Sequence, residues 1–163
     1  MALVLASLFA SLVMSVAHAE PPVQACPWST AAFAPASAPR APVVLMALSP
    51  RMVYSLLEWR RMRALAADAG WCVIPARDPR VPLLEWQQAV TSANLPELRA
   101  APSLADLGVP SAPFLNHAPT SQAWLCGHAH PWPIFGIMTD TGWQRSLHAR
   151  LLDLERDAPC PTP

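Results

Sequence analysis

The chain has 163 residues, of which 53% are hydrophobic and 13% are charged. That length allows one domain with short extensions, and the hydrophobic share is ample for a packed core. The formal net charge is zero, which argues against nucleic acid as a partner, because a broad nucleic-acid surface needs a basic patch.

Residues 1–19 are predicted to be an export signal. An apolar run, broken only by serines, leads into Ala17-His18-Ala19, which is typical of a signal cleavage site. The run is too short for a comfortable membrane span, and no Lys or Arg precedes it. We therefore expect a cleaved signal peptide and a periplasmic or secreted protein. An uncleaved segment that gives weak membrane association is the alternative. Residues 20–41 are rich in Pro, Ala and Ser and favour an extended linker.

Four cysteines follow the proposed cleavage site, and their number is even: Cys26, Cys72, Cys126 and Cys160. In an oxidising compartment they permit up to two disulfides, in three connectivities. Cys26 and Cys160 lie outside the predicted regular elements, so we expect a bridge between them that ties both tails to the domain. Cys72 and Cys126 fall on predicted strands, where free cysteines are often buried and inert.

Residues 42–75 are predicted to form a βαβ unit. Residues 43–48 are apolar on both faces, as in a central strand. Ser49-Pro50 is expected to start a helix, since serine caps helices and proline suits their first turn. Gly70 is expected to stop this helix before a strand over residues 71–75. The predicted core side of the helix is Val53, Leu56, Leu57, Met62 and Leu65, and the predicted solvent side is Glu58, Arg60, Arg61 and Arg63.

The second half of the chain is predicted to add a helix, two strands and a final helix. A turn over residues 78–82 precedes a helix with Leu83, Trp86, Ala89 and Val90 on its apolar side. Prolines break residues 95–116, apart from one capped turn over 103–108. Strands are expected over 121–126 and 133–138, with a turn at Gly127. Thr139 or Asp140 is expected to cap a helix whose apolar stripe is Trp143, Leu147, Leu151 and Leu154.

This order of elements over residues 42–156 resembles the thioredoxin-like fold, with residues 157–163 as a tail. The resemblance implies an α/β fold in which a central mixed four-stranded sheet (β-α-β-α-β-β-α) carries helices on both faces. Ala118-Pro119-Thr120 is similar to the motif in which the family has a cis proline before its third strand, and Gly136 is similar to the glycine that precedes its last helix. A cis bond before Pro119 is therefore implied.

The junction between the first strand and its helix departs from the family. Thioredoxins carry a C-x-x-C there, where the helix N-terminus lowers a thiol pKa. Here the junction reads Leu48-Ser49-Pro50-Arg51-Met52 and contains no cysteine. A hydroxyl does not form the mixed disulfide that a thiolate forms. We therefore expect a redox-inactive member of the fold, with no catalytic residue and no cofactor.

Ser and Pro at this junction, with Met close by, are also similar to the F-type pilus-assembly proteins of conjugative transfer systems. The similarity implies a binding or assembly module in the bacterial cell envelope, whose partners are envelope or secretion-apparatus proteins. In this fold the loop before the cis proline can pair with an extended peptide. The predicted protein-binding residues are Ser49, Pro50, Arg51, Met52, Ala118, Pro119 and Trp132. The sequence leaves the oligomeric state open.

An alternative function rests on the spacing C-x-H-x-H at Cys126, His128 and His130. One thiolate and two imidazoles are ligands that suit zinc or copper. No fourth ligand is evident, although His117 is the nearest candidate, and a polar hairpin tip explains the pattern equally well. A thiol enzyme that uses Cys126 or Cys72 in an unusual position is the related possibility. Free, fast-reacting thiols would distinguish it from a binding module.

Overall fold

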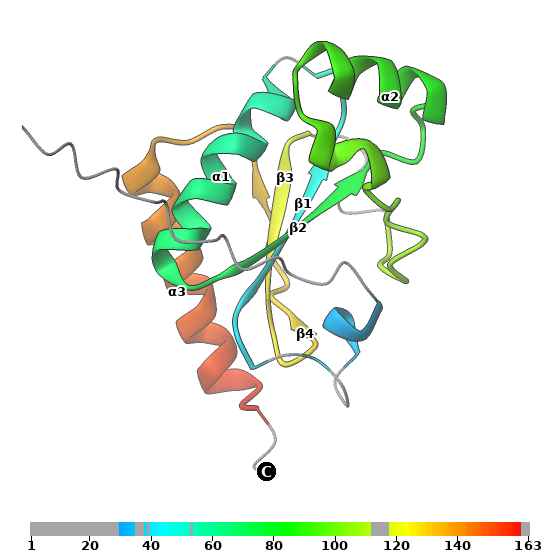
Figure 1. Cartoon of the computed structure of the whole chain (residues 1–163). Helices are drawn as coiled ribbons and strands as arrows, with labels where there is room; N and C mark the ends of the chain where they lie inside the picture. The colour runs from blue at the N-terminus through cyan, green and yellow to red at the C-terminus, as the bar shows by residue number, and fades with distance from the viewer. Residues whose placement is uncertain (1–29, 35–37, 39, 53, 112–117, 161–163) are drawn as a thin grey trace, which may run out of the picture.

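A computed structural model of the protein describes residues 30–34, 38, 40–52, 54–111 and 118–160. Its described strands form one mixed sheet in the order β2-β1-β3-β4, and β5 also pairs with β3 (Figure 1). The strands are β1 (Val43–Leu48), β2 (Cys72–Arg77), β3 (Thr120–Leu125), β4 (His128–Ala129) and β5 (Ile134–Phe135).

The centre of the sheet is β1. It pairs in parallel with β2, from Val43 opposite Cys72 to Leu48 opposite Arg77. It pairs antiparallel with β3, from Val43 opposite Trp124 to Ala47 opposite Thr120. Every residue of β1 is buried, which confirms the prediction that an apolar run without alternation is a central strand.

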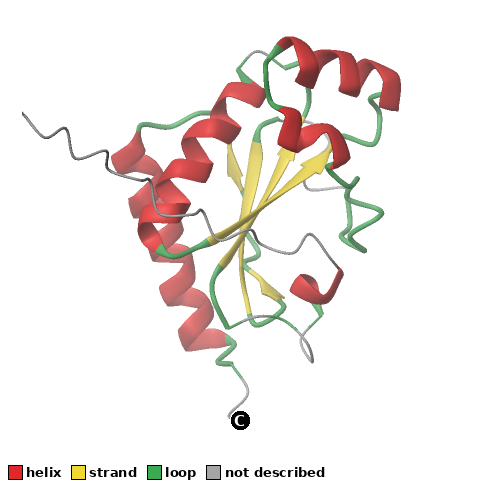
Figure 2. Ribbon diagram, in the orientation of Figure 1, coloured by secondary structure: helices red, strands yellow, loops and turns green. Residues whose placement is uncertain are grey.

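The helices cover the two faces of the sheet unequally (Figure 2). They are α1 (Ser55–Ala69), α2 (Leu83–Ser92) and α3 (Asp140–Asp157), with 3-10 helices η1 (Thr30–Phe33) and η2 (Pro96–Ala100). The three α-helices and η2 share one core with Val44, Met46 and Leu48. The other face is covered by η1 and by residues 104–109. The predicted α/β class with a mixed sheet is thus confirmed, but the expectation of helices on both faces is not, because one 3-10 helix and an irregular segment cover the second face.

Helix α1 begins later than predicted. Its first residue is Ser55, and residues 50–54 form turns. Ser49 is buried directly after β1, and its N–H donates to Oγ of Ser55 at 3.0 Å, so Ser49 does not cap the helix, whose N-cap position is Tyr54. Gly70 ends α1 in the left-handed conformation, with φ 70°, which confirms the predicted stop.

The buried face of α1 also differs from the prediction. Glu58 was expected in solvent, yet it is 2% exposed, whereas Leu57 was expected in the core and is 49% exposed. The Glu58 carboxylate accepts hydrogen bonds from Nε1 of Trp143 and from Nη1 of Arg61, the latter at 3.0 Å. These partners remove the cost of burying an unpaired carboxylate. Val53 lies outside the described residues. The other buried positions of α1 are Ser55, Trp59, Met62, Leu65 and Ala66.

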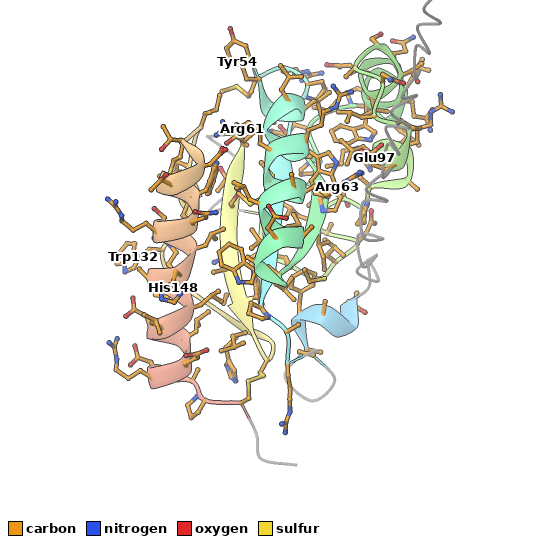
Figure 3. All side chains as sticks on the ribbon, turned by 60° about the vertical axis from the view of Figure 1, so that its left-hand side comes forward. Tyr54, Arg61, Arg63, Glu97, Trp132 and His148 are labelled. Carbon is orange, nitrogen blue, oxygen red and sulfur yellow. A yellow bond between two sulfur atoms is a disulfide. The ribbon has the colours of Figure 1, made fainter. Side chains whose placement is uncertain are left out.

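The arginines of α1 make hydrogen bonds to neighbouring elements and do not simply form a solvated helix face. Nη2 of Arg60 donates to the carbonyl oxygens of Ala93 and Asn94, at 2.8 and 2.9 Å. Nη1 of Arg63 donates to Oε1 of Glu97 at 3.0 Å, a pair that lies between α1 and η2 in Figure 3. These bonds hold α1 against the end of α2 and against η2.

The C-terminal elements largely follow the sequence. In α3 the Oγ1 of Thr139 accepts from the N–H of Gly142 at 3.1 Å, so Thr139 is the N-cap. The four residues of the predicted apolar stripe are all buried. Of the strand expected over 133–138 only β5, residues 134–135, forms, and the short strand β4 lies before it, in the stretch predicted as a turn. Two prolines between these strands, Pro131 and Pro133, have no N–H to continue a ladder.

The packed unit extends beyond the predicted limits of 42 and 156. Ala32 of η1 is buried in the second core. The ring of Phe33 meets that of Trp124 edge-on, with centroids 4.8 Å apart. At the other end, Cys160 packs against the first core. Part of the expected linker is therefore core. The predicted signal peptide lies outside the described residues, and no described helix is long and apolar enough to cross a membrane.

Candidate functional site

A disulfide joins Cys126 to Cys160, with 5.5 Å between their Cα atoms. The predicted Cys26–Cys160 bridge is therefore wrong, because the end of α3 brings Cys160 to the turn after β3. Cys26 lies outside the described residues. Cys72 is also disulfide-bonded, so the expectation that Cys72 and Cys126 are free core thiols is wrong as well.

The disulfide changes the meaning of the C-x-H-x-H spacing. The sulfur of Cys126 is bonded to another sulfur, so it is not a free thiolate ligand. His128 is exposed. His130 is buried, and its Nδ1 accepts from the N–H of Trp132 at 3.2 Å while its Nε2 lies 3.5 Å from Asp153. Within the described ranges, no cluster of three or more His, Cys, Asp or Glu side chains is placed to hold a metal ion.

The residues at the β1–α1 junction lie at the opposite end of β1 from this disulfide, since Val43 pairs with Trp124 and Ala47 with Thr120. Next to the junction, the N–H of Asp78 donates to the carbonyl oxygen of Leu48 at 2.9 Å. The Asp78 carboxylate accepts three hydrogen bonds from Arg80, at 2.9, 3.0 and 2.9 Å. Burial raises the pKa of Asp78, but the bonds from Arg80 and from the Ser49 hydroxyl together hold it below its ordinary value.

Exposed apolar side chains surround this buried polar centre. Met52 is 42% exposed and Tyr54 is 61% exposed. Tyr54 has φ 65°, in the left-handed region that an aromatic residue rarely adopts, and it projects from the end of the molecule in Figure 3. Leu83 and Leu84 at the start of α2 are exposed too. Leu83 was expected on the core side of its helix, where Trp86 and Val90 are buried as predicted.

The peptide bond between Ala118 and Pro119 is cis, as the sequence resemblance implies. Pro119 is next to Thr120, which pairs with Ala47 near the end of β1. The carbonyl oxygen of Pro119 accepts from the N–H of Gly136 at 2.9 Å. The sheet therefore brings Pro119 to the same end of the molecule as the β1–α1 junction.

Trp132 is the predicted binding residue that does not join this group. Its side chain is 72% exposed, but its carbonyl oxygen accepts from Nε of Arg150 at 2.9 Å, which places it on the flank of α3. In Figure 3 it lies beside His148, well apart from Tyr54.

Two exposed residues near Pro119 were missed by sequence reasoning, Phe135 and, two positions later, Ile137. Phe135 of β5 pairs with Thr120, so it lies next to Pro119. Burial alternates along 134–137, with Ile134 inside and Phe135 outside. In the sequence the same stretch reads Ile-Phe-Gly-Ile, without a polar residue that would mark an exposed face, so no sequence signal identified these two side chains as exposed.

Comparison with known proteins shows the fold. No protein-family model matches the sequence, and no curated protein matches it either. A solved candidate thioredoxin from Neisseria meningitidis aligns with a TM-score of 0.51 at 15% identity, over 72% of this chain and 79% of that chain. MTB dsbF, solved in mixed oxidized and reduced forms, aligns with a TM-score of 0.47 at 15% identity, over 68% of this chain and 81% of that chain. The chain has a thioredoxin-like fold.

Proposed function

We propose that the protein is a thioredoxin-like binding module of the bacterial cell envelope, and that it works without dithiol chemistry. The observation that supports this best is the composition of the β1–α1 junction. Where the fold would carry a reactive dithiol, the chain has a buried Ser49 and an exposed Met52 and Tyr54. Exposed apolar side chains around a buried, hydrogen-bonded polar centre suit protein recognition rather than disulfide exchange.

The cysteines support an exported protein. Within the described residues no cysteine is free, and disulfides persist mainly in oxidising compartments such as the periplasm. Export also agrees with the apolar N-terminal sequence and its cleavage-site pattern.

The more specific part of the proposal is a role in assembling a conjugative DNA-transfer apparatus. It rests on the similarity of Ser49-Pro50-Arg51-Met52 to the junction of F-type pilus-assembly proteins. A partner chain would bind as an added strand beside Ala118, with main-chain hydrogen bonds providing affinity. Met52, Phe135 and Ile137 would contact its side chains.

A pull-down from envelope extracts tests the proposal. Wild type is compared with Met52→Asp and with Leu152→Asp. The second variant is a matched control, because Leu152 is 50% exposed but lies on α3. We expect a co-purifying pilus-assembly or secretion protein to be lost with Met52→Asp alone. Equal recovery of every partner by the three folded proteins would exclude this surface.

A further inference from the structure

Two arginines beside the β1–α1 junction are each held by one carboxylate. Nε and Nη2 of Arg51 donate to the two oxygens of Glu85, at 2.7 and 2.5 Å. Nε and Nη2 of Arg80 donate to the two oxygens of Asp78, at 3.0 and 2.9 Å. Such bidentate pairs fix the plane and direction of a guanidinium.

Both guanidinium groups lie at the β1–α1 junction and face solvent, since Arg51 belongs to the junction and Asp78, which holds Arg80, donates its N–H to the carbonyl oxygen of Leu48. Hydrogen bonding to Asp78 raises the pKa of Arg80, while the nearby positive charge of Arg51 opposes that rise. The side chains of Arg51 and Arg80 are 52% and 51% exposed. By contrast, the Asp78 side chain is only 9% exposed, so it pairs with Arg80 from the buried side of the guanidinium.

Within the part of the chain that the structure describes, each guanidinium has one nitrogen that is not used by its carboxylate. Nη1 of Arg51 and Nη1 of Arg80 make no hydrogen bond to any residue that the structure describes. The apolar side chains of Met52 and Tyr54 follow Arg51 in the chain, and Leu84 precedes its partner Glu85; all three are exposed. The surface therefore offers two oriented cationic donors next to apolar contact area.

We propose that Arg51, Arg80, Met52 and Tyr54 form a docking surface for an acidic segment of a partner protein. A carboxylate of that segment accepts hydrogen bonds from the two free Nη1 groups, and a neighbouring apolar side chain packs on Met52 and Tyr54. The inference rests on the proposed function, a binding module, and adds the chemistry of its partner.

Charge favours a protein segment over a membrane or a nucleic acid. Both arginines are paired with carboxylates, and the whole chain has no net charge. Anionic membranes are recognised by clusters of about 4–8 basic residues, and nucleic acids need an extended basic surface. Two oriented guanidiniums suit one carboxylate, which they recognise by geometry rather than by bulk charge.

A library of random short peptides, displayed on phage and selected on the immobilised full chain, identifies the preferred chemistry. We expect selected peptides to carry Asp or Glu beside an aromatic or aliphatic residue. Affinities of the synthesised peptides are then measured with Arg51→Gln, Met52→Asp and Arg99→Gln. Arg51 is the decisive position, because its partner Glu85 is partly exposed and tolerates its loss. Arg99 is an exposed arginine on η2 and serves as the charge-matched control.

We expect Arg51→Gln to weaken peptide binding about ten- to a hundredfold, as the loss of a charge-assisted hydrogen bond would, and Arg99→Gln to leave it unchanged. Selected peptides without acidic residues, or equal binding by wild type and Arg51→Gln, would overturn the inference. If Met52→Asp still abolished binding in that case, the proposed function would stand. Arg51-dependent binding to phosphatidylglycerol vesicles, in place of peptides, would also overturn it. The inference would also be overturned if no peptide were selected above the background of a blank surface. The pull-down described above would then still test the proposed binding module independently.

Discussion

At the scale of single residues, the buried carboxylate of Glu58 is the least expected feature. It lies on α1 and accepts from Trp143 of α3, 85 positions away in the sequence. Arg61 connects the same cluster to the start of α3 through Asp140 at 2.5 Å and through the carbonyl oxygen of Met138 at 2.7 Å. A hydrophobic pattern cannot reveal such a residue, because the partners that allow its burial come from another helix.

We predict that Glu58→Ala lowers the free energy of unfolding by about 3 kcal/mol, because it leaves the buried Trp143 N–H without an acceptor and Arg61 without one carboxylate. Glu58→Gln should cost less, since its amide oxygen can still accept from Trp143. Urea denaturation measures both. Glu155→Ala, at an exposed position of α3, is the control, and an equal effect of Glu58→Ala and Glu155→Ala would contradict the prediction.

Asp78 should make stability depend on pH. Its folded pKa lies below the ordinary value of 3.8, so its ionised form is favoured by folding. The contribution is present above that ordinary value and is lost as the pH falls through the folded pKa. We therefore expect Asp78→Asn to have a lower free energy of unfolding than wild type at neutral pH. The difference in free energy between the two proteins should become smaller in acid. A difference that stays constant in denaturation curves across this range would show that Asp78 acts without its charge.

At the scale of elements, the disulfide ties the end of α3 to the turn between β3 and β4. It closes a loop with a sequence separation of 34, which the chain-entropy model values at about 3–4 kcal/mol. We predict that Cys160→Ser lowers the unfolding free energy by about this amount. Thermal and urea unfolding measure the loss. The variant has no Cys126–Cys160 bond for a reducing agent to break, so this bond should make no contribution to any effect of reduction on it. A Cys160→Ser protein that is as stable as wild type would contradict the prediction.

Some elements could be predicted from the sequence because their signals are local. Thr139 followed by an apolar stripe identifies α3, and an uninterrupted apolar run identifies β1. The start of α1 could not be predicted, since Ser49-Pro50 has the local form of a helix start but Ser49 is held in the core by Ser55. The pairing of Cys160 depends on where α3 ends in space, and spacing alone leaves three connectivities open.

The candidate site was predicted only in part for the same reason. The junction residues and Pro119 follow from the order of elements, and the structure brings them to one end of the sheet. Trp132 is a predicted binding residue too, but the break between β4 and β5 places it beside α3. Tyr54 is exposed because the helix begins one turn later than its sequence indicates.

At the scale of the whole molecule, the fold separates the Cys126–Cys160 disulfide from the end where Met52 and Tyr54 are exposed. We predict no reduction of insulin disulfides at a rate comparable to a thioredoxin, because no thiolate lies at the β1–α1 junction. A turbidity assay with a thioredoxin as positive control measures this. Comparable turnover that disappears in Cys126→Ser would contradict the prediction and support the thiol enzyme instead.

Because Ala32 is buried and Phe33 contacts Trp124, the predicted linker of residues 20–41 cannot all act as free chain before the fold begins. A fully extended chain spans at most about 3.5 Å per residue. Residues 20–41 would thus reach about 75 Å as a free linker, but residues 20–29 reach only about 35 Å before η1 joins the fold. A copy held in the membrane by an uncleaved first segment would therefore search only a thin layer next to the bilayer, so its partners would have to present their binding segments there.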